Sequence, residues 1–265
     1  MAPATPVVFI HGLWIHSSSW QPWQELFAAN GYLPSAPGWP GDSDSVASTR
    51  AHSDAVAGIG IDDITSSYRE HIRTLPAKPI VIGHSFGGLI AQKLLDSGHA
   101  AAAVAIDPGQ IKGVKPVPLS QIRSALPVLS RPANKKKAVA LTEKQFAYGF
   151  GNQLSRTESD ALYRRVTIPG PGRVLFEGTS ANFTKNSPAA VDVRNNERGP
   201  LLLIAGTNDH TVPEVVVRAA HKLYQHSHAV TDLAVLPGKG HSLVFDSGWR
   251  EVADRTLAWL RSQNL

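Results

Sequence analysis

The alternation of short apolar segments, typical of buried strands, with segments of helical spacing is the strongest constraint on this chain's fold. In the first part of the chain we expect strands at Val7–Ile10, Leu33–Trp39, Pro79–Ile82 and Ala102–Ile106. Helices are expected between them, at about Trp20–Phe27, Ile61–Leu75 and Ser85–Leu95. This order predicts right-handed βαβ units, and therefore a mainly parallel sheet covered by helices on both faces.

The alternation stops between about residues 110 and 195, where prolines divide short helical stretches and no strong strand is found. It resumes with expected strands at Leu201–Gly206 and Ala229–Leu236 and expected helices at Pro213–Tyr224 and Trp249–Leu260. A chain of 265 residues could form one or two domains. An insertion within one domain explains the interruption better, so we expect a discontinuous α/β core, residues 1–109 and 196–265, with a helical cap at 110–195.

The composition excludes several classes of protein. The chain has no cysteine, which excludes a disulfide framework, a thiolate zinc site and a cysteine nucleophile. Hydrophobic residues at 42% and charged residues at 18% exclude a disordered chain. Because the sequence has neither a signal peptide pattern nor an apolar run of about 18 residues, we expect a cytoplasmic protein that does not span a membrane.

The net charge of +5 could indicate nucleic acid or an anionic surface as a partner. Its densest cluster is Lys135–Lys137, close to Arg131 and Lys144, with no interleaved aromatic residues that could stack on bases. Short charge runs are usually solvated, so we expect no nucleic acid and no membrane as a partner. Whether the cluster favours acidic substrates or only increases solubility stays open, and so does the choice between monomer and homodimer.

The segment Gly83-His84-Ser85-Phe86-Gly87 matches the G-x-S-x-G motif, in which a serine occupies a sharp turn between a strand and a helix. So short a motif also occurs by chance, and its specificity comes from the apolar strand before it and the helical segment after it. The amino terminus of that helix would stabilise negative charge developing beside the serine. We therefore predict that Ser85 is a nucleophile; a serine that only caps the helix is the alternative.

A serine hydroxyl needs a base to accept its proton and an acid to orient that base. Of the 11 histidines, His241 is the best candidate for the base, because it follows the last expected strand in the glycine-rich loop Pro237–His241. An ordinary histidine of a surface loop is the alternative.

The best candidate for the acid is Asp209, just after the strand Leu201–Gly206. It could instead only cap the helix that begins near Pro213. Asp107 is a rival, because it too ends a strand and could reach the same edge of the sheet.

The backbone N–H groups of Leu13 and Phe86 are candidates for the oxyanion hole, since each follows the carboxyl end of a strand. The side chain of His11 is expected to brace the first loop by hydrogen bonding. Candidates for the substrate pocket are Trp14, Phe146, Phe150 and Phe183. For each of these rings, packing in the core is the favoured interpretation, because aromatic residues dominate cores.

No cofactor and no metal is expected. His226 and His228 are the nearest approach to a metal motif, but they lack a third ligand at a suitable spacing.

Three motifs, His11-Gly12, Gly83-His84-Ser85-Phe86-Gly87-Gly88 and Gly240-His241, together with Asp209, resemble the α/β-hydrolase superfamily over nearly the whole chain. Their order, serine then aspartate then histidine, is that of the superfamily. The resemblance implies the α/β-hydrolase fold with a cap inserted after the sixth strand of the standard fold. Because the chain opens on the strand that ends at His11-Gly12, the first two usual strands are expected to be missing. In this compactness it resembles the plant group of methyl esterases and hydroxynitrile lyases.

The resemblance implies a serine hydrolase that cleaves a carboxylic ester or lactone of a small to medium hydrophobic substrate through an acyl-enzyme. Cofactor-free perhydrolases of the haloperoxidase type share the triad and stay an alternative. A hydroxynitrile lyase-like enzyme on the same triad is a further alternative, which is disfavoured because the lyases have a lysine close to the position of Ser242. Dehalogenase and epoxide hydrolase activities are not expected, because Ser85 replaces the aspartate nucleophile of those enzymes. A ligand receptor of the same fold without catalysis is the remaining alternative.

Overall fold

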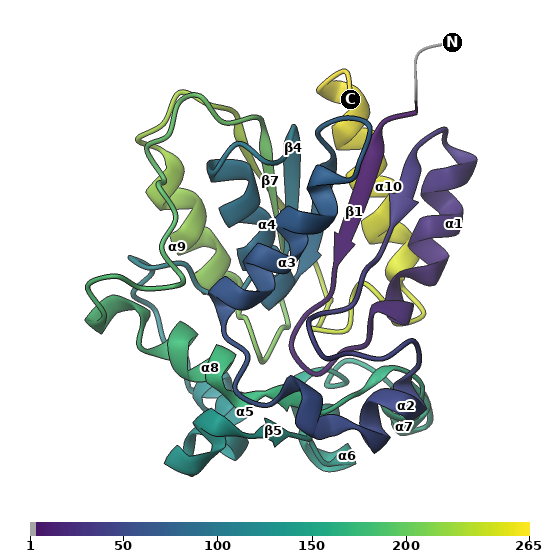
Figure 1. Ribbon diagram of the computed structural model, residues 1–265, viewed down its shortest axis with the longest axis vertical. Helices are drawn as coiled ribbons and strands as arrows, with labels where there is room; N and C mark the ends of the chain where they lie inside the picture. The colour runs from purple at the N-terminus through teal and green to yellow at the C-terminus, as the bar shows by residue number, and fades with distance from the viewer. Residues whose placement is uncertain (1–3) are drawn as a thin grey trace.

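A six-stranded sheet forms the middle of the structure, a computed structural model that describes residues 4–265 (Figure 1). In spatial order its strands are β2 (Leu33–Ser35), β1 (Pro6–Ile10), β3 (Ile80–His84), β4 (Ala102–Ile106), β7 (Leu201–Gly206) and β8 (Thr231–Leu236). All neighbouring strands are parallel. The carboxyl ends of the strands therefore share one edge, where the following loops converge.

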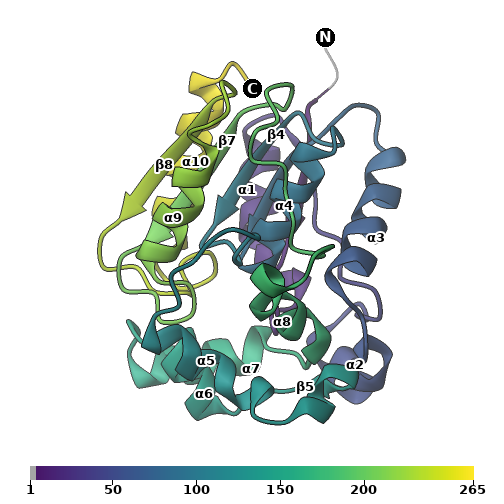
Figure 2. The ribbon, with the colours of Figure 1, turned by 90° about the vertical axis from the view of Figure 1, so that its left-hand side faces the viewer.

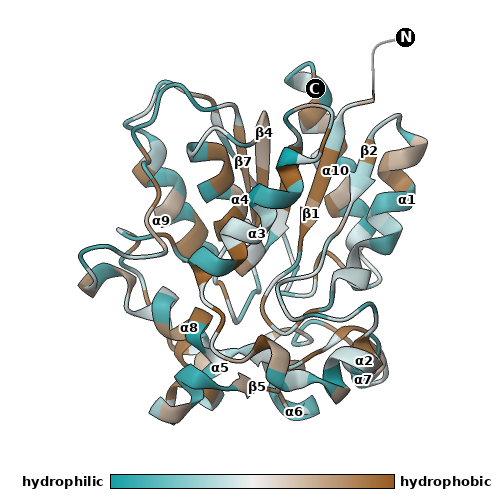
Figure 3. Cartoon of the chain, in the orientation of Figure 1, coloured by the Kyte–Doolittle hydropathy of each residue, from teal (hydrophilic) through white to brown (hydrophobic). Residues whose placement is uncertain are grey.

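The central strands are apolar on both sides. Every residue of β1, β3, β4 and β7 is buried, and Figure 3 shows hydrophobic colouring along the middle of the sheet. Parallel strands need helices on both faces, so they consist of continuous rather than alternating apolar residues.

Helices cover both faces of the sheet (Figures 1 and 2). On one face lie α3 (Ile61–Arg73), α4 (Phe86–Asp96) and α9 (Glu214–Tyr224). On the other lie α1 (Gln21–Ala29) and α10 (Trp249–Ser262), where Trp23 of α1 packs against Trp249 of α10. This arrangement confirms the predicted fold class.

A further layer of short helices crosses the carboxyl edge of the sheet, at the bottom of Figures 1 and 2. It consists of α5 (Leu119–Leu129), α6 (Glu143–Gly149), α7 (Arg156–Val166) and α8 (Gly172–Thr179), and α2 (Val46–Ala51) lies beside it. The two-residue strands β5 (Ala138–Val139) and β6 (Gly170–Pro171) pair antiparallel within it. We call these elements the α5–α8 layer.

Side chains tie this layer to the rest of the molecule. The guanidinium of Arg50, on α2, donates to the backbone oxygens of Tyr163 and Thr167 at the end of α7. The carboxylate of Glu177, on α8, accepts a hydrogen bond of 2.8 Å from the backbone N–H of Ile61, at the start of α3. Within residues 4–265, no helix has both the length and the apolar character that crossing a membrane requires.

Two strands are shorter than predicted. β2 stops at Ser35 because Pro37 and Pro40 cannot donate to a ladder, and the N–H of Trp39 points instead to Asp42. β8 begins at Thr231 rather than Ala229: the carbonyl of Val230 still accepts from the N–H of Leu201 in β7, whereas the carbonyl of Ala229 accepts from the side chain of the buried Arg198.

Candidate active site

Ser85 occupies the sharp turn between β3 and α4. Its backbone has φ 55° and ψ −125°, which is an unfavourable conformation for a residue with a side chain. Hydrogen bonds hold the turn: the N–H of Ser85 donates to the carbonyl of Ile106 at 2.9 Å, and its own carbonyl accepts from the N–H groups of Gly88 and Gly109 at 2.9 and 2.7 Å. The neighbouring loops therefore fix the position of the serine hydroxyl.

The glycines of the motif are required by close backbone contacts. A Cβ atom on Gly83 would overlap the carbonyl of Gly87, and one on Gly87 would overlap the carbonyl of Ile10. Only glycine lets α4 start this close to β1 and β3.

The structure brings Ser85, His241 and Asp209 together in one buried chain of hydrogen bonds. His241 Nε2 lies 3.0 Å from Ser85 Oγ, and His241 Nδ1 lies 2.5 Å from Asp209 Oδ2. The three residues are at most 4% exposed and follow the carboxyl ends of β3, β8 and β7. With its proton on Nδ1, His241 donates to Asp209 and can accept the proton of the serine hydroxyl.

Asp209 is held as a carboxylate from both sides. Its Oδ1 accepts from the backbone N–H groups of Thr211 and Val212 at 2.6 and 2.8 Å. Burial alone would raise its pKa, but the interactions with His241, Asp107 and the N–H of Val212 hold the pKa of Asp209 below its ordinary value. Asp209 is therefore hydrogen-bonded both to the histidine and to the backbone of the turn before α9.

Asp107 lies beside this pair but makes different contacts. Its Oδ1 accepts a hydrogen bond of 2.8 Å from the backbone N–H of Gly206, and a side-chain hydrogen bond links Asp107 to the carboxylate of Asp209. Burial, and then the negative charge of Asp209, raise the pKa of Asp107 well above its ordinary value. A neutral Asp107 is consistent with these surroundings, and the carboxylate bonded to His241 is that of Asp209.

The same carboxylates form the one group of three potential metal ligands within the described residues, Asp107, Asp209 and His241, with ligand atoms inside 4.8 Å. The 2.5 Å separation of His241 and Asp209 is that of a hydrogen bond, so no ion fits between them.

Two backbone N–H groups close to Ser85 are candidates for an oxyanion hole. Gly12–Ile15 forms a tight turn after β1, in which the N–H of Ile15 donates to the carbonyl of Gly12 and Trp14 has φ 69°. Within residues 4–265, the N–H groups of Leu13 in this turn and of Phe86 at the start of α4 donate to no other protein group. A Cβ on Gly12 would lie 2.8 Å from Ser85 Cβ, which shows how closely this turn approaches the serine. Two unused donors beside a nucleophile are what an oxyanion hole requires.

His11 braces this turn, as predicted. Its Nε2 lies 3.1 Å from Asp42 Oδ2 and 3.2 Å from the N–H of Trp39, whose ring stacks on the imidazole.

Ser85 opens onto a cavity of about 230 Å³ between the sheet edge and the α5–α8 layer. Gln121, Ile122, Ser124, Ala125 and Leu129 of α5 form one wall, and Leu175, Gly178 and Thr179 of α8 form another. The remaining lining residues are Leu13, Trp14, Phe86, Gly109, Gln110, Val117, Thr211 and Val212. Within the described chain, no charged side chain lines this cavity, which suits an uncharged, largely apolar ligand.

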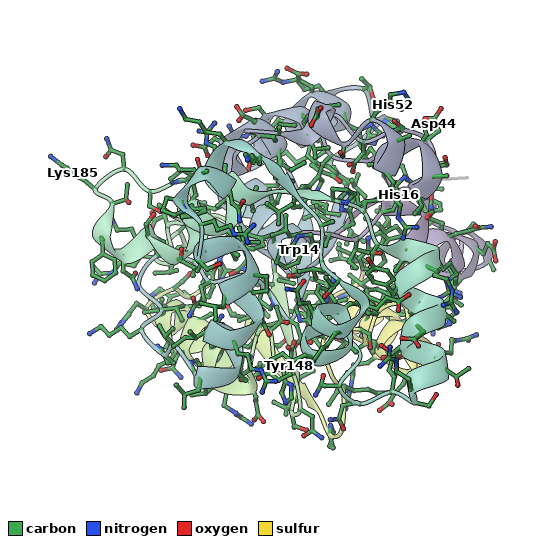
Figure 4. The ribbon with its side chains drawn as sticks, turned by 90° about the horizontal axis from the view of Figure 1, so that it is seen from below. Trp14, His16, Asp44, His52, Tyr148 and Lys185 are labelled. Carbon is green, nitrogen blue, oxygen red and sulfur yellow. The ribbon has the colours of Figure 1, made fainter. Side chains whose placement is uncertain are left out.

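The four aromatic candidates for the pocket lie in different surroundings. Trp14 lines the cavity, and Figure 4 shows it near the centre of the molecule viewed from below. Phe146 and Phe150 are buried outside the lining; their rings stack on each other, and the ring of Phe150 lies 4.8 Å from that of His241. Phe183 is 91% exposed and also lies outside the lining.

Sequence reasoning did not identify α5 and α8 as the cavity walls. The apolar residues Leu119, Ile122 and Leu126 do recur at helical spacing, which was a usable signal for a helix. Which side of that helix faces the serine depends on tertiary packing.

The sequence matches the alpha/beta hydrolase family over residues 7–255. A search among curated proteins finds no match. Among solved structures, a methylesterase from Arabidopsis is similar with a TM-score of 0.68 at 16% identity, covering 97% of this chain and 99% of that one. A monoacylglycerol lipase from Paleococcus ferrophilus has a TM-score of 0.62 at 22% identity, covering 98% and 96%. An esterase from Thermogutta terrifontis has a TM-score of 0.68 at 15% identity, covering 99% and 91%. At these identities the similarity concerns the fold, whereas the family match extends over most of the sequence: this chain belongs to the alpha/beta hydrolase family.

Proposed function

We propose that this protein is a serine hydrolase that cleaves carboxylic esters or lactones of small to medium hydrophobic substrates. The observation that carries the proposal is the hydrogen-bonded series Ser85, His241 and Asp209 at the end of an apolar cavity. Esterase and lipase names among the structural neighbours are consistent with it.

In the first step Ser85 Oγ attacks the carbonyl carbon of the substrate while His241 Nε2 takes the hydroxyl proton. The carbonyl oxygen becomes an oxyanion, which the backbone N–H groups of Leu13 and Phe86 stabilise. His241 then gives its proton to the leaving alcohol oxygen as the ester bond breaks, and the acyl group stays on Ser85. Asp209 stabilises the imidazolium that exists between these two proton transfers.

In the second step a water molecule attacks the acyl-enzyme, with His241 as the base that accepts its proton. The second oxyanion collapses, Ser85 regains its proton from His241, and the carboxylic acid leaves. A lactone follows the same course, except that the alcohol and the acid remain in one product.

The cavity supports the choice of substrate. Its volume of about 230 Å³ is below the range of about 300–1,000 Å³ of pockets for drug-sized ligands. Because its lining is uncharged, a substrate with a charged group on the buried side would lose hydration without a compensating ion pair.

The experiment is a screen of p-nitrophenyl and lactone substrates of increasing acyl length, with wild type, Ser85→Ala and Ser159→Ala side by side. Ser159 is a matched control, since it is a buried serine of α7 that lies outside the cavity lining. We expect Ser85→Ala to lose at least about 10³-fold in kcat/KM, and Ser159→Ala to resemble wild type.

Equal turnover by wild type and Ser85→Ala would contradict the proposal. A wild-type protein that binds these esters without hydrolysing them would instead be a receptor of the same fold.

A further inference from the structure

The outward side of α5 is apolar. Leu119, Ile122 and Leu126 are 84, 45 and 54% exposed, and their spacing of three and four residues places them along one side of the helix. The opposite side buries Ala125 and Val128. A helix on a protein surface normally presents polar residues to solvent, so this side has the character of a surface that meets an apolar partner. We call Leu119, Ile122 and Leu126 the apolar stripe.

The segment that carries the apolar stripe is strongly cationic. From Pro108 to Thr142 the sequence has seven lysine and arginine residues and no aspartate or glutamate. Six of the seven are exposed, among them Arg123 beside the apolar stripe on α5 and Lys135–Lys137 after the helix. None of the seven forms an ion pair with a carboxylate of residues 4–265. Their summed charge exceeds the net charge of the whole chain, which is +5.

The apolar stripe adjoins the mouth of the cavity that contains Ser85. Ile122 belongs to both, since it is 45% exposed and lines the cavity. Val117, just before α5, is 59% exposed and also lines the cavity. An apolar molecule entering from the stripe would therefore pass from one apolar surface to another.

We infer that the apolar stripe and the cations around it dock the protein on an anionic lipid surface, with the mouth of the cavity toward the lipid. Apolar side chains that enter the acyl region, flanked by lysine and arginine that contact the headgroups, are the pattern of interfacial helices. This revises the expectation, made from the sequence, that no membrane is a partner. A membrane-associated state would supply the site with substrates dissolved in lipid.

A second copy of this chain fits the surface less well. In a two-fold symmetric contact the same patch meets itself. The unpaired cations of one copy would then face those of the other, which is unfavourable. Anionic headgroups complement the same charges.

The test is sedimentation of the full chain with phosphatidylcholine vesicles, with and without phosphatidylglycerol, and without any ester substrate. We expect binding that depends on phosphatidylglycerol and weakens as salt shortens the Debye length from about 10 Å at 0.1 M to about 3 Å at 1 M. Leu119→Ser/Leu126→Ser is expected to reduce the partition coefficient by at least about tenfold. Lys135→Gln/Lys136→Gln/Lys137→Gln is expected to weaken binding only to the anionic vesicles.

The control is Leu33→Ser/Val230→Ser, which changes two exposed apolar residues, 49 and 47% exposed, at the start of β2 and just before β8. These positions are at the opposite edge of the sheet from the cavity, and binding should equal that of wild type. Circular dichroism melts of each variant identify any loss of folding.

Absence of wild-type binding would overturn the inference, and so would equal binding by Leu119→Ser/Leu126→Ser. So would sedimentation velocity showing that the apolar stripe mediates a dimer that excludes vesicles. Because no turnover is measured, these outcomes are independent of the proposed hydrolysis.

Discussion

Replacing Asp209 by asparagine is expected to abolish nearly all hydrolysis while leaving the fold intact. The two backbone N–H groups that donate to Oδ1, from Thr211 and Val212, would keep the amide oxygen of the new side chain on that side. The NH₂ group would then face His241 Nδ1 at the position of Oδ2. His241 must accept this hydrogen bond with Nδ1, which places its proton on Nε2, and Nε2 can no longer accept the proton of Ser85.

The expected loss of activity follows from the wrong tautomer of His241. In serine hydrolases with this triad, the same change lowers kcat by about 10⁴-fold, or about 5.4 kcal/mol of transition-state stabilisation. Asp107→Asn is a matched control, because it is the same change in a neighbouring buried carboxyl. Its oxygen can keep the hydrogen bond from the N–H of Gly206, and its NH₂ group can donate to the carboxylate of Asp209, as a protonated Asp107 does. We expect Asp107→Asn to lose less than about tenfold.

The assay is kcat/KM on a short p-nitrophenyl ester for both variants, with thermal melts to show that each is folded. Comparable losses in the two variants would contradict the assignment of Asp209 as the orienting acid. A larger loss in Asp107→Asn than in Asp209→Asn would transfer that role to Asp107.

Three further outcomes are expected. Gly87→Ala should strongly lower the melting temperature, because its Cβ would overlap the carbonyl of Ile10. Gly98→Ala is the control; its φ is +73° with open space around it, so it should cost only about 1–2 kcal/mol of stability. Equal effects of the two changes in circular dichroism melts would show that the close packing of α4 on β1 is not needed. Ala125→Phe fills part of the cavity, so kcat/KM should fall more steeply with acyl length than in wild type; an unchanged profile across the ester series would place acyl binding elsewhere. Burial raises the pKa of Asp107 above its ordinary value of about 3.9. At a pH between these two values the unfolded chain has released a proton that the folded protein keeps. The free energy of unfolding therefore falls by about 1.4 kcal/mol for each pH unit in this range. Asp107→Asn removes this dependence, and its melting temperature relative to wild type should rise with pH from about pH 4; a constant difference would mean that Asp107 is ionised in the folded protein.

Much of the core could be predicted from sequence, because its determinants are local. Continuous apolar runs mark the buried strands, and the ends of β3 and β4 agree with the predictions to within two residues. The turn at Ser85 is marked by glycines adjacent to it in the sequence, although the need for glycine at position 87 comes from a contact with Ile10 of β1, which is distant in sequence. The division into a core, residues 1–109 and 196–265, and a cap, 110–195, stays a prediction.

The cavity could not be predicted in the same way. Phe146 and Phe150 are of a residue type common in ligand pockets, but in the folded protein their rings stack on each other and the ring of Phe150 packs against His241. Which of Asp107 and Asp209 bonds to the histidine also depends on long-range contacts. Both residues follow strands, and only the position of the His241 ring distinguishes them. The apolar stripe likewise follows from how α5 packs, since Ala125 and Val128 take its buried side.

The most direct test of an activated Ser85 is intact-mass spectrometry after treatment with a fluorophosphonate. We expect a single adduct that peptide mapping assigns to Ser85, no adduct on Ser85→Ala, and much slower labelling of His241→Ala, which lacks the base 3.0 Å from Oγ. A wild-type protein that stays unlabelled, or that is labelled at another residue, would contradict the account.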